Sequence, residues 1–503
     1  DLITRRGADL ISRAEVLIYD HLASPELLGL TSPNCQKIYA GKIGSKHTLT
    51  QDQINDHLVK SAQKGLTVVR LKGGDPYIFG RGGEEALVLY EAGIDFEVIP
   101  GVSSSVAAPA AAGIPLTHRD LSSQVVIMTG HEKPGKERSA HDFSALARLG
   151  TIAVVMGAEN LAYLSESLIA AGKDPDTPAA MIQWGYTYQQ KTLVATLGSL
   201  PQRAAEEGLG PPSVVVIGAV VNLRSKLSWF ERRPLFGRRI MVTMTRSQAS
   251  LLSKALRELG GEVIERPVIE IEPIWPNNDL EKAFKDLSNF NWLVLTSPNG
   301  ASIFMKSLLA SSLDARALGS LKIAAIGPGT AEALAPFGLK ADLMPQEYIA
   351  EGLVEAFSQV VKSNASSGAS YDTSKPNRCL IARSASGREV LSQGLRDLGF
   401  EVTEVSLYQT KTAAFLPVPY GSGKSYDFLD NPPDLTTLTS ASTAHGLAQL
   451  IPEESRHLYP TVSIGPITTQ AAQSLGFTVV AQSQKATIGD LVKTITAFLG
   501  ANR

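Results

Sequence analysis

The sequence predicts an α/β protein of two parts, in which each part is divided into two lobes. Three observations lead to this prediction. Short apolar runs alternate with helical patterns, as they do in mostly parallel sheets. Residues 223–238 are dense in charge and contain Pro234 and Gly237, which is typical of the end of a domain and a short linker. A new α/β pattern then begins at Ile240, and it repeats itself within the second half.

The composition bounds the class of protein. The chain has 503 residues, too many for one hydrophobic core, and 44% of them are apolar. A net charge of −2 argues against binding nucleic acid through bulk positive charge. Cys35 and Cys379 lie far apart without metal-ligand spacing, so we expect reduced thiols in a cytoplasmic protein and no metal. No apolar run reaches the roughly 18 residues of a membrane span, so we expect no membrane partner.

Residues 1–113 form the first predicted lobe. The spacing of apolar residues predicts helices over residues 2–14, 50–64 and 84–92 and a further helix ending at Ala112. Short apolar runs predict strands over residues 16–19, 36–40, 66–71 and 96–99. Because helices separate these strands, the sheet should be parallel, with the carboxyl ends of its strands at one edge.

Residues 114–230 form the second predicted lobe. We expect strands over residues 124–129, 151–156, 179–183, 193–196 and 214–217. Fewer helices separate these strands, which favours more antiparallel pairing than in the first lobe.

The second half of the chain contains an internal repeat. Residues 240–270 and 379–409 each contain a strand, an arginine, a helix, a Leu-Gly pair and another strand. Further on, residues 295–300 match 438–443, and residues 326–331 match 464–469. We therefore predict two similar lobes that face each other across a cleft. Residues 364–377 and 416–433 are rich in Ser, Gly, Asp or Pro and are predicted to be surface loops.

The stretch VVRLKGGDPYIFGRGGEE, residues 68–85, is the strongest candidate for a functional loop. It passes from a buried strand into a turn with four glycines between Gly73 and Gly82, and Lys72, Asp75 and Arg81 surround that turn. Open α/β sheets bind ligands at such strand-to-helix loops. By spacing alone, however, the loop fits a structural turn equally well.

Several other polar residues follow predicted strands in the first half. Asp20 and Lys42 fall at carboxyl ends of neighbouring strands, where a carboxylate and an ammonium serve as base and acid. Ser103 and Ser104 precede a helix, so they either cap it or bind a ligand. His118 and Arg119 lie between the two lobes. For each of these residues alone, a structural role is the simpler interpretation.

The loops of the second half carry neutral hydroxyl groups. Ser297, Thr330, Ser440 and Thr468 occur in the repeated loops at strand ends, which suit carboxylates or phosphates. Ordinary helix capping is the alternative for any one loop. Tyr408 closes the second copy of the repeat, where a core position is the more common role for a tyrosine.

These motifs resemble two known families. VVRLKGGDPYIFGRGGEE, VIPGVSSSVAAPAAAGIPLTHRD, VVMG and LSWF closely resemble uroporphyrinogen-III C-methyltransferase, a tetrapyrrole methylase that uses S-adenosylmethionine, across residues 1–230. TSPNG, IGPGTAEAL, EYIAEGL, LIARSASGRE and IGPITTQAA are similar to uroporphyrinogen-III synthase across residues 237–498. Such fusions belong to bacterial sirohaem and cobalamin pathways. The resemblance implies a two-lobed tetrapyrrole methylase domain followed by a duplicated two-lobed synthase domain.

The resemblance also implies domain bounds. We expect the methyltransferase at residues 1–230, a linker at 231–238 and the synthase at 239–503. The first synthase lobe should comprise residues 239–270 and 408–503, and the second should comprise residues 271–407.

The resemblance implies roles for single residues. Asp20 would accept a proton, Lys42 would donate one, and Tyr408 would be the acid of the synthase. The cofactor contacts would be Gly73, Gly74, Asp75, Ile78, Ser103, Ser104, Met156 and Gly185. For the substrate carboxylates we expect contacts from Arg81, His118 and Arg119, and in the synthase from Ser297, Thr330, Ser440 and Thr468.

One departure from the family concerns the amino terminus. The methyltransferase family opens with a strand and a GxGxGDP-type loop, and this sequence starts just after both. We expect a truncation that leaves out one edge of the cofactor pocket and an inner strand of the sheet.

The implied reactions form a sequence. The synthase would cyclise hydroxymethylbilane to uroporphyrinogen III with inversion of ring D and loss of water. The methyltransferase would then methylate C2 and C7 to give precorrin-2, and the family resemblance implies a homodimer through this half. The alternative is a methylase of the same fold that acts on another substrate, joined to a two-lobed binding domain without catalytic activity.

Overall fold

The computed structural model describes residues 2–41, 49–131, 141–244, 246–366, 377–387, 389–413, 418–419, 425–426, 428–429 and 431–501. The chain divides into two compact units. The first consists mainly of Asp1–Arg239, and the second of Ile240–Ala255, Val263–Phe415 and Pro433–Arg503. Among the described residues, no helix is long and apolar enough to cross a membrane.

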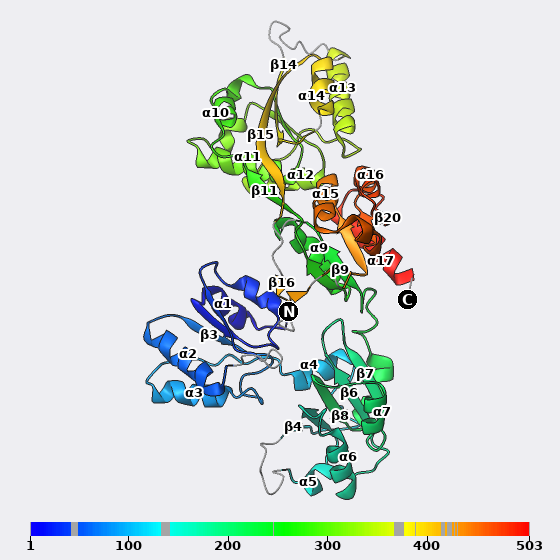
Figure 1. Ribbon diagram of the computed structural model, residues 1–503. Helices are drawn as coiled ribbons and strands as arrows, with labels where there is room; N and C mark the ends of the chain where they lie inside the picture. The colour runs from blue at the N-terminus through cyan, green and yellow to red at the C-terminus, as the bar shows by residue number, and fades with distance from the viewer. Residues whose placement is uncertain are drawn as a thin grey trace. The chain divides into compact units, whose positions relative to one another are not determined.

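The first lobe of the first unit contains a three-stranded parallel sheet with the order β2-β1-β3 (Figure 1). Its strands are β1 (Val16–Tyr19), β2 (Gln36–Tyr39) and β3 (Val68–Leu71). Tyr19 is paired with Tyr39 on one side and with Leu71 on the other. The three strands therefore end at the same edge of the sheet, as the alternating pattern predicted.

Helices cover both faces of this sheet. They are α1 (Arg5–Arg13), α2 (Gln51–Gln63) and α3 (Gly82–Glu91), with a short 3-10 helix, η1 (Pro25–Leu30). Ile54 and Leu58 of α2 pack on Val16 and Ile18, because alternate strand residues point to opposite faces. A capping box at Thr50 fixes the start of α2, where its hydroxyl accepts a hydrogen bond from the Gln53 N–H.

The strand expected at residues 96–99 is not formed. Residues 94–103 lie outside helices and strands, and Phe96 is 45% exposed. A β-strand needs a neighbouring strand for its backbone hydrogen bonds, and no described strand pairs with this segment. Apolar sequence alone was therefore insufficient to predict a strand here.

The second lobe of the first unit contains a five-stranded sheet with the order β4-β5-β8-β6-β7. Its strands are β4 (Val126–Thr129), β5 (Ile152–Val155), β6 (Pro178–Gln183), β7 (Lys191–Thr196) and β8 (Ser213–Ile217). Only β4 and β5 are parallel, and the other neighbours are antiparallel. This agrees with the predicted change in pairing after residue 113.

Two separate cores cover the faces of this second sheet. On one face pack α5 (Phe143–Ala147), α6 (Leu161–Ala170) and α7 (Leu200–Glu206), with Leu164 against Met181. The other face packs against α4 (Ser104–Ala111), where Ala108 contacts the cluster of Ile182 and Val216. Helix α4 thus joins the loops of the first lobe to the second sheet.

The stretch predicted as a linker begins in contact with the second lobe. It follows the 3-10 helix η2 (Ala219–Leu223) and helix α8 (Arg224–Leu227). The Glu231 carboxylate accepts hydrogen bonds from Gln190 Nε2 at 2.9 Å and Thr192 Oγ1 at 2.7 Å, and it pairs with Arg224. These bonds anchor residue 231 beside β7.

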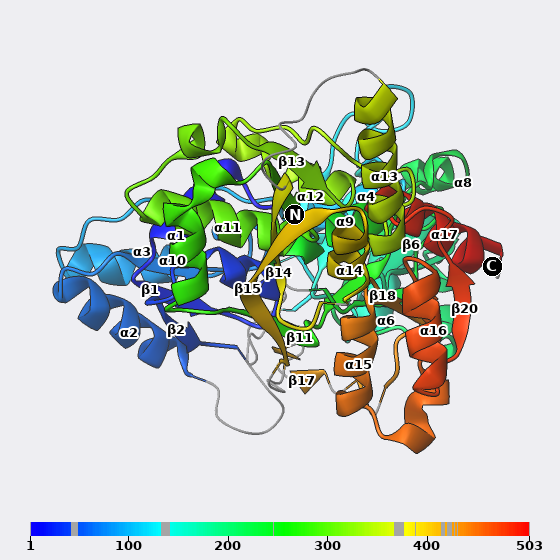
Figure 2. The ribbon, with the colours of Figure 1, turned by 90° about the horizontal axis from the view of Figure 1, so that it is seen from above.

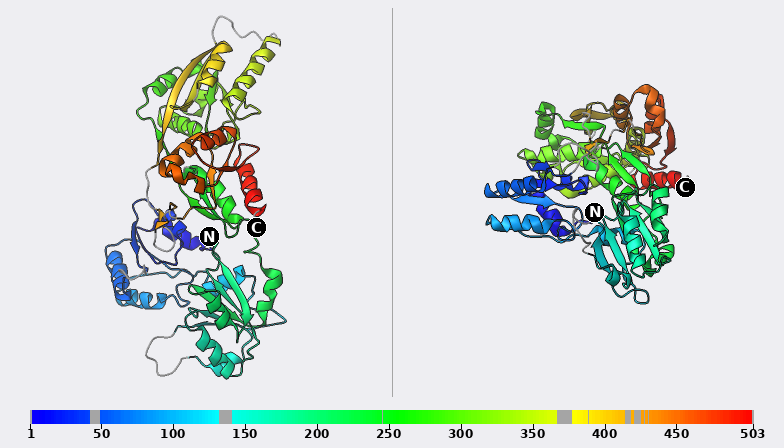
Figure 3. Two further views of the ribbon diagram at one scale, coloured as in Figure 1. Left: turned by 45° about the vertical axis from the view of Figure 1, so that its right-hand side comes forward. Right: turned by 60° about the horizontal axis from the view of Figure 1, so that its bottom comes forward.

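The second unit contains two five-stranded sheets. The first has the order β10-β9-β18-β19-β20. Its strands are β9 (Arg239–Val242), β10 (Glu262–Glu265), β18 (Leu435–Leu438), β19 (Thr461–Ser463) and β20 (Val479–Gln482). Its helices are α9 (Arg246–Glu258), α15 (Ala441–Leu450), α16 (Pro466–Ser474) and α17 (Ile488–Ala501), with the 3-10 helix η6 (Glu453–Leu458). Helices α15 and α16, in orange and red, lie side by side (Figure 3).

The second sheet of this unit has the order β11-β15-β14-β12-β13. Its strands are β11 (Ile269–Pro273), β12 (Trp292–Leu295), β13 (Lys322–Ala325), β14 (Asn377–Ser384) and β15 (Phe400–Thr412). Its helices are α10 (Asn278–Lys285), α11 (Pro298–Ala310), α12 (Pro328–Glu332), α13 (Ala350–Ser366) and α14 (Val390–Asp397), with the 3-10 helices η3 (Leu287–Asn289), η4 (Ala315–Leu318) and η5 (Ala335–Phe337). A separate hairpin pairs β16 (Val418–Pro419) with β17 (Ser425–Tyr426).

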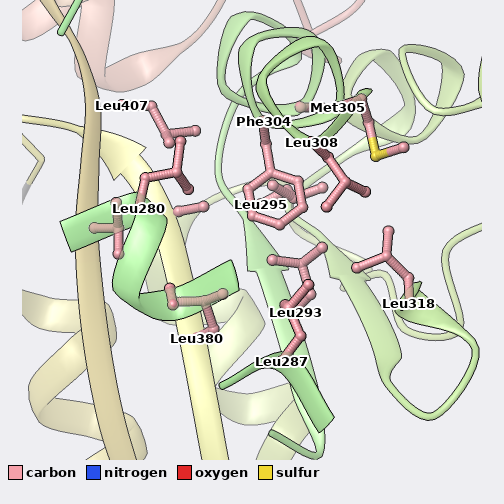
Figure 4. Packing of buried hydrophobic residues seen from close by; sticks show 14 of the residues in the cluster. Leu280, Leu287, Leu293, Leu295, Phe304, Met305, Leu308, Leu318, Leu380 and Leu407 are labelled. Carbon is pink, nitrogen blue, oxygen red and sulfur yellow. The ribbon is translucent and has the colours of Figure 1, made fainter. Parts of the chain in front are cut away.

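Both faces of this second sheet are buried. Phe304 and Leu308 of α11 pack on Leu293 and Leu295 of β12, with Leu407 of β15 nearby (Figure 4). On the opposite face, α13 and α14 lie side by side beside β14 and β15 (Figure 2). Parallel strands covered on both faces read as continuous apolar runs, which is why these strands were recognisable in the sequence.

The strand orders of the two sheets correspond. The order β10-β9-β18-β19 in one sheet matches β15-β14-β12-β13 in the other when the repeated sequence segments are aligned. An isolated parallel bridge between Ala324 and Leu343 occupies the place that β20 has in the first sheet. The topology therefore supports the interpretation that the second half arose by duplication. The sequence predicted that residue 408 begins the return to the first synthase lobe. Strand β15 instead continues to Thr412, so Tyr408 belongs to the second lobe, which was predicted to end at residue 407.

Candidate active sites

The glycine loop after β3 folds tightly on itself. Gly74 has φ +78°, and Phe79 and Arg81 also have positive φ. A Cβ atom at Gly80 or Gly82 would lie 2.7 or 2.6 Å from the carbonyl oxygen of Pro76. Positive φ at residues other than glycine is uncommon and concentrates at functional sites. The conformation of the loop therefore requires glycine at residues 80 and 82, and its positive φ values mark it as a candidate functional site.

Asp75 joins this loop to the next one. Its Oδ2 accepts a hydrogen bond from the Gly101 N–H at 3.0 Å, and its Oδ1 accepts one from the Tyr77 N–H at 2.8 Å. Gly101 lies so close to the carbonyl oxygen of Gly74 that no side chain fits there. Asp75, which was predicted to contact the cofactor, thus uses one oxygen to hold the two loops together and the other to hold the turn of its own loop.

Helix α4 begins at the second of these loops. Ser103 is the N-cap, and its buried Oγ accepts a hydrogen bond from the Ser105 N–H at 3.3 Å. Ser104 is exposed, and its backbone nitrogen lies near Gly74. Of the two serines predicted to contact a cofactor, Ser104 has the accessible side chain and Ser103 serves the helix.

The second lobe contributes strained residues at the ends of its strands. Met156 follows β5 with φ +54° and is 52% exposed. After β6, Gly185 packs directly on Ala108 of α4, and Trp184 and Tyr186 beside it have positive φ. Helix α4 therefore links Gly74, through its amino-terminal end, to Gly185.

A cluster of charged side chains lies at the carboxyl edge of the first sheet. Arg70 of β3 lies between two carboxylates, with its Nη2 3.6 Å from Asp20 Oδ2 and its Nε 3.3 Å from Glu85 Oε1. Lys72 Nζ lies 3.1 and 3.2 Å from the two oxygens of Glu85, and Gln51 donates to the same carboxylate. The Leu22 N–H donates to Asp20 Oδ1 at 3.1 Å.

The cluster is largely withdrawn from solvent. The side chains of Glu85, Lys72 and Arg70 are 6%, 9% and 13% exposed, whereas that of Asp20 is 25% exposed. Burial, together with the charge of Arg70, lowers the pKa of Lys72. Asp20 is thus the most accessible carboxylate of a charge-balanced cluster. Sequence reasoning assigned no role to Arg70 or Glu85, although their charges within an apolar strand and at a helix start were a signal.

Lys42, the predicted acid, lies outside the described residues. Gly41, which precedes it, lies against the backbone nitrogen of His21 and the hydroxyl of Tyr39, so this chain segment ends next to Asp20. Tyr39 itself has a raised pKa because of burial and the neighbouring Tyr19 and Asp20.

The three residues predicted to bind substrate carboxylates make local contacts. Arg81 donates to its neighbour Glu84 at 2.9 and 2.7 Å, and its side chain is exposed. His118 Nδ1 accepts a hydrogen bond from the Asp120 N–H at 3.2 Å, and Arg119 is exposed. Among the described residues, none of these three side chains forms a hydrogen bond or ion pair with the cluster around Asp20, although the Arg81 carbonyl accepts a hydrogen bond from the Glu85 N–H.

Tyr408 of β15 is the centre of a second candidate site. Its side chain belongs to the buried core, with 6% exposure, and its hydroxyl lies 2.9 Å from Ser297 Oγ. Burial raises the pKa of Tyr408, and hydrogen bonds from Ser297 and Ser384 oppose that rise. Ser297 is the N-cap of α11 and accepts a hydrogen bond from the Gly300 N–H at 2.9 Å. Ser384 was not singled out in the sequence, although it lies in the matched segment LIARSASGRE.

The other predicted substrate contacts lie at helix starts. Ser440 caps α15 by accepting a hydrogen bond from the Thr443 N–H at 3.1 Å. Thr330 and Thr468 lie in the first turns of α12 and α16 and are only 2% and 4% exposed. Burial removes these two hydroxyl groups from the surface, so the neighbouring backbone N–H groups are the better donors for a ligand.

Comparison with known proteins agrees with this two-part organisation. Residues 1–201 match the family model described as Tetrapyrrole (Corrin/Porphyrin) Methylases, and residues 250–493 match Uroporphyrinogen-III synthase HemD. The porphyrin biosynthesis protein HemD of Ruminiclostridium josui is 37% identical over 503 residues, covering 100% of this chain and 96% of that protein.

Two relatives match the first half alone. The uroporphyrinogen-III C-methyltransferase of Bacillus subtilis is 47% identical over 232 residues, covering 46% of this chain and 90% of that protein. The S-adenosyl-L-methionine-dependent uroporphyrinogen III methyltransferase of Methanosarcina barkeri is 46% identical over 228 residues, covering 45% of this chain and 89% of that protein. The chain combines a tetrapyrrole methylase with a synthase of the HemD type. It belongs to the family of porphyrin biosynthesis proteins that carry both parts in one polypeptide.

Proposed function

We propose that this chain carries out two consecutive steps of tetrapyrrole biosynthesis. Its second half cyclises hydroxymethylbilane to uroporphyrinogen III, with inversion of ring D and loss of water. Its first half methylates that product at C2 and C7 to precorrin-2, using S-adenosylmethionine. The observation that carries this proposal is a full-length relative in porphyrin biosynthesis together with successive matches to both families.

The first unit has residues that fit S-adenosylmethionine. The loops at Gly73 and Gly74 and at Gly101 are braced by Asp75, and these glycines leave backbone groups without covering side chains. The exposed apolar side chains of Ile78 and Met156 suit an adenosyl group. The exposed Ser104 and the backbone at Gly185 add polar groups at the ends of α4 and β6. When bound, this cofactor supplies an activated methyl group.

In the methyltransferase half, the residues of the chain manage a proton. We assign Asp20 as the base, because its carboxylate is the most accessible carboxylate of the charged cluster at the carboxyl edge of the sheet. Lys42 would supply the acid from the next strand end. Arg81, His118 and Arg119 remain proposed contacts for substrate carboxylates, supported by the exposed position of the two arginines, the partly exposed position of His118 and their positive charge or polarity.

In the synthase half, holding the substrate in one conformation matters more than strong acid or base groups. Helices α11, α12, α15 and α16 each begin at the carboxyl end of a parallel strand. The partial positive charge at the amino-terminal ends of these helices suits the carboxylates of a linear tetrapyrrole. Tyr408 is assigned as the acid that protonates the departing hydroxyl group of ring A.

A product analysis tests the proposed function. The chain is supplied with hydroxymethylbilane alone and then with S-adenosylmethionine. The expected products are uroporphyrinogen of the type III isomer and, with the cofactor, precorrin-2. Type I isomer alone would contradict the synthase assignment. Methyl transfer to another tetrapyrrole but not to uroporphyrinogen III would favour a methylase of different specificity.

We also propose that the protein acts in the cytoplasm as a homodimer formed through the methyltransferase half. The family resemblance supports the dimer, and Leu87 and Tyr90 on one side of α3 are 63% and 75% exposed. Sedimentation velocity on the wild type and on a Leu87→Ser, Tyr90→Ser double variant checks this proposal. A wild type that sediments as a monomer at micromolar concentration would contradict it.

A further inference from the structure

The Tyr408 hydroxyl lies beside two serine hydroxyl groups. It lies 2.9 Å from Ser297 Oγ and also hydrogen-bonds Ser384. Both serines come from strand ends of the same sheet, Ser297 after β12 and Ser384 at the end of β14. The three hydroxyl groups are therefore held by one rigid core and do not depend on movement between lobes.

The fold places Ser384 beside Tyr408 through an irregularity in the sheet. The register of β14 and β15 shifts between Arg383 and Ser384, so that Arg383 pairs with Ser406 and Ser384 pairs with Tyr408. Bulges of this kind redirect a side chain and are common next to active sites. The Ala385 N–H donates to the Tyr408 carbonyl at 2.9 Å and fixes the shifted register.

Each serine already accepts a hydrogen bond from the backbone. Ser297 Oγ accepts from the Gly300 N–H at 2.9 Å, and Ser384 Oγ accepts from the Ser386 N–H at 3.4 Å. A hydroxyl group carries one proton and two lone pairs. The backbone donor takes one lone pair of each serine, so each serine keeps its own proton for a hydroxyl neighbour, which is Tyr408 for Ser297 and Tyr408 or Ser386 for Ser384. In the arrangement in which both serines donate, Tyr408 accepts two hydrogen bonds and keeps its own proton for another acceptor.

We propose that Ser297 and Ser384 are positioning residues that make buried Tyr408 an effective proton donor for the synthase reaction. This inference rests on the proposed synthase function. A phenol buried in an apolar core is a weak acid, because its anion loses the solvation of water. Two neighbouring serine hydroxyl groups, which can donate to the phenol oxygen, and the amino-terminal end of α11 stabilise the phenolate that forms when the proton leaves.

The proton balance of the step is closed. The C–O bond of the hydroxymethyl group breaks, its electron pair stays on oxygen, and that oxygen takes the Tyr408 proton and departs as water. The phenolate remains until the macrocycle closes. Closure releases a proton from the ring carbon that forms the new bond, and this proton returns the phenolate to phenol. No other reactant is required.

The charged side chains of the neighbouring strands pair with one another. Arg383 pairs with Glu404, and Lys411 pairs with Glu272. Those of α10 lie on its exposed side. The acidity of Tyr408 is therefore assigned to its burial and to the two serines.

Carbon-13 NMR of the full chain, labelled at tyrosine Cζ, measures the acidity of Tyr408 directly. The Tyr408→Phe variant identifies its resonance. In Ser384→Ala and in Ser297→Ala, the pKa of Tyr408 is expected to rise above its wild-type value. Ser384→Thr, which keeps a hydroxyl group, is expected to restore it. Ser311→Ala is the matched control, because Ser311 bonds a backbone carbonyl at the opposite end of α11.

Cyclisation kinetics supply the second measurement. Ser384→Ala is expected to lower kcat about 10-fold with little change in KM, which is less than the effect of losing the acid itself. Ser384→Thr should recover most of kcat, and Ser311→Ala should match the wild type.

An unchanged or lower pKa of Tyr408 in both alanine variants would overturn the proposal, and so would an unchanged kcat. If Ser297→Ala fails to fold for lack of its cap, Ser384→Ala still decides. A wild type that forms no type III isomer would remove the synthase function, whereas the titration would still show whether the serines tune Tyr408.

Discussion

The two candidate sites differ in the kind of polar side chain that surrounds the group proposed to exchange a proton. At the carboxyl edge of the first sheet, Arg70, Lys72 and Glu85 are ionised side chains that balance one another, and Asp20 stands at the exposed end. Around Tyr408, the neutral hydroxyl groups of Ser297 and Ser384 contact the phenol oxygen.

The difference follows from the physical cost of burying charge. An ionised group withdrawn from water requires a partner of opposite charge, so the first site depends on a complete network. Hydroxyl groups cost less free energy to bury, and their effect depends on the geometry of their hydrogen bonds and not on a net charge. We therefore expect the first site to be sensitive to charge and pH, and the second to be sensitive to geometry.

The largest effect is expected for Asp20, the proposed general base of the charged site. Asp20→Asn keeps an acceptor for the Leu22 N–H but cannot take a proton. Methyl transfer should slow by about 10²–10⁴-fold, the usual contribution of a general base. The rate is measured with uroporphyrinogen III and S-adenosylmethionine. Wild-type activity in this variant would exclude Asp20 from the reaction.

The next largest effect concerns the stability of the same network. Glu85→Gln leaves Arg70 and Lys72 buried without a full counter-charge, and we expect a loss of about 3 kcal/mol in the free energy of unfolding. Glu84→Gln, which alters an exposed pair with Arg81, is the control and should cost less than about 1 kcal/mol. Urea denaturation of both variants gives the comparison. Equal losses would mean that burial does not matter here.

A smaller effect is expected when the neutral site loses Tyr408, its proposed acid. Tyr408→Phe should slow cyclisation by about 10²-fold without abolishing it, because conformational control of the substrate persists. Rate and isomer ratio are measured with hydroxymethylbilane. If neither changes, the acid of the synthase lies elsewhere.

The smallest effect is a pH dependence confined to the charged site. Burial lowers the pKa of Lys72 below 10.5, its ordinary value, so the folded state binds its proton less tightly than the unfolded state. Stability should therefore rise with pH between the folded pKa and 10.5, as the unfavourable charge is lost. Lys72→Met should lack this part of the rise. Denaturation midpoints of variant and wild type across the alkaline range test this prediction. Identical pH profiles would argue against a lowered pKa of Lys72 in the folded state.

Much of the fold was legible because local patterns were strong. Val16–Tyr19 and Trp292–Leu295 are short apolar runs between helical segments, and both became central parallel strands. The repeated segments around Leu295 and Leu438 predicted the matching order of two sheets. Residues 96–99 show the limit, because an apolar run forms a strand only beside a partner.

Individual roles at the sites were harder to predict, because they depend on which groups meet. Asp75 stands in a glycine loop typical of ligand sites, yet its carboxylate holds the Gly101 and Tyr77 N–H groups. Thr330 and Thr468 follow strands like exposed loop residues, yet they are buried. Neither the burial of a side chain nor the saturation of its hydrogen bonds can be read from its neighbours in sequence.

The sequence by itself determined the α/β class, the two parts, the repeat and the families that the motifs resemble. These depend on periodicity, turn residues and motif order, which are local properties of the chain. Tertiary structure decided that Glu85 balances Arg70 and Lys72, and that a shift in register brings Ser384 to Tyr408. Those contacts join residues distant in the chain, and packing and strand pairing select them, so no local pattern records them.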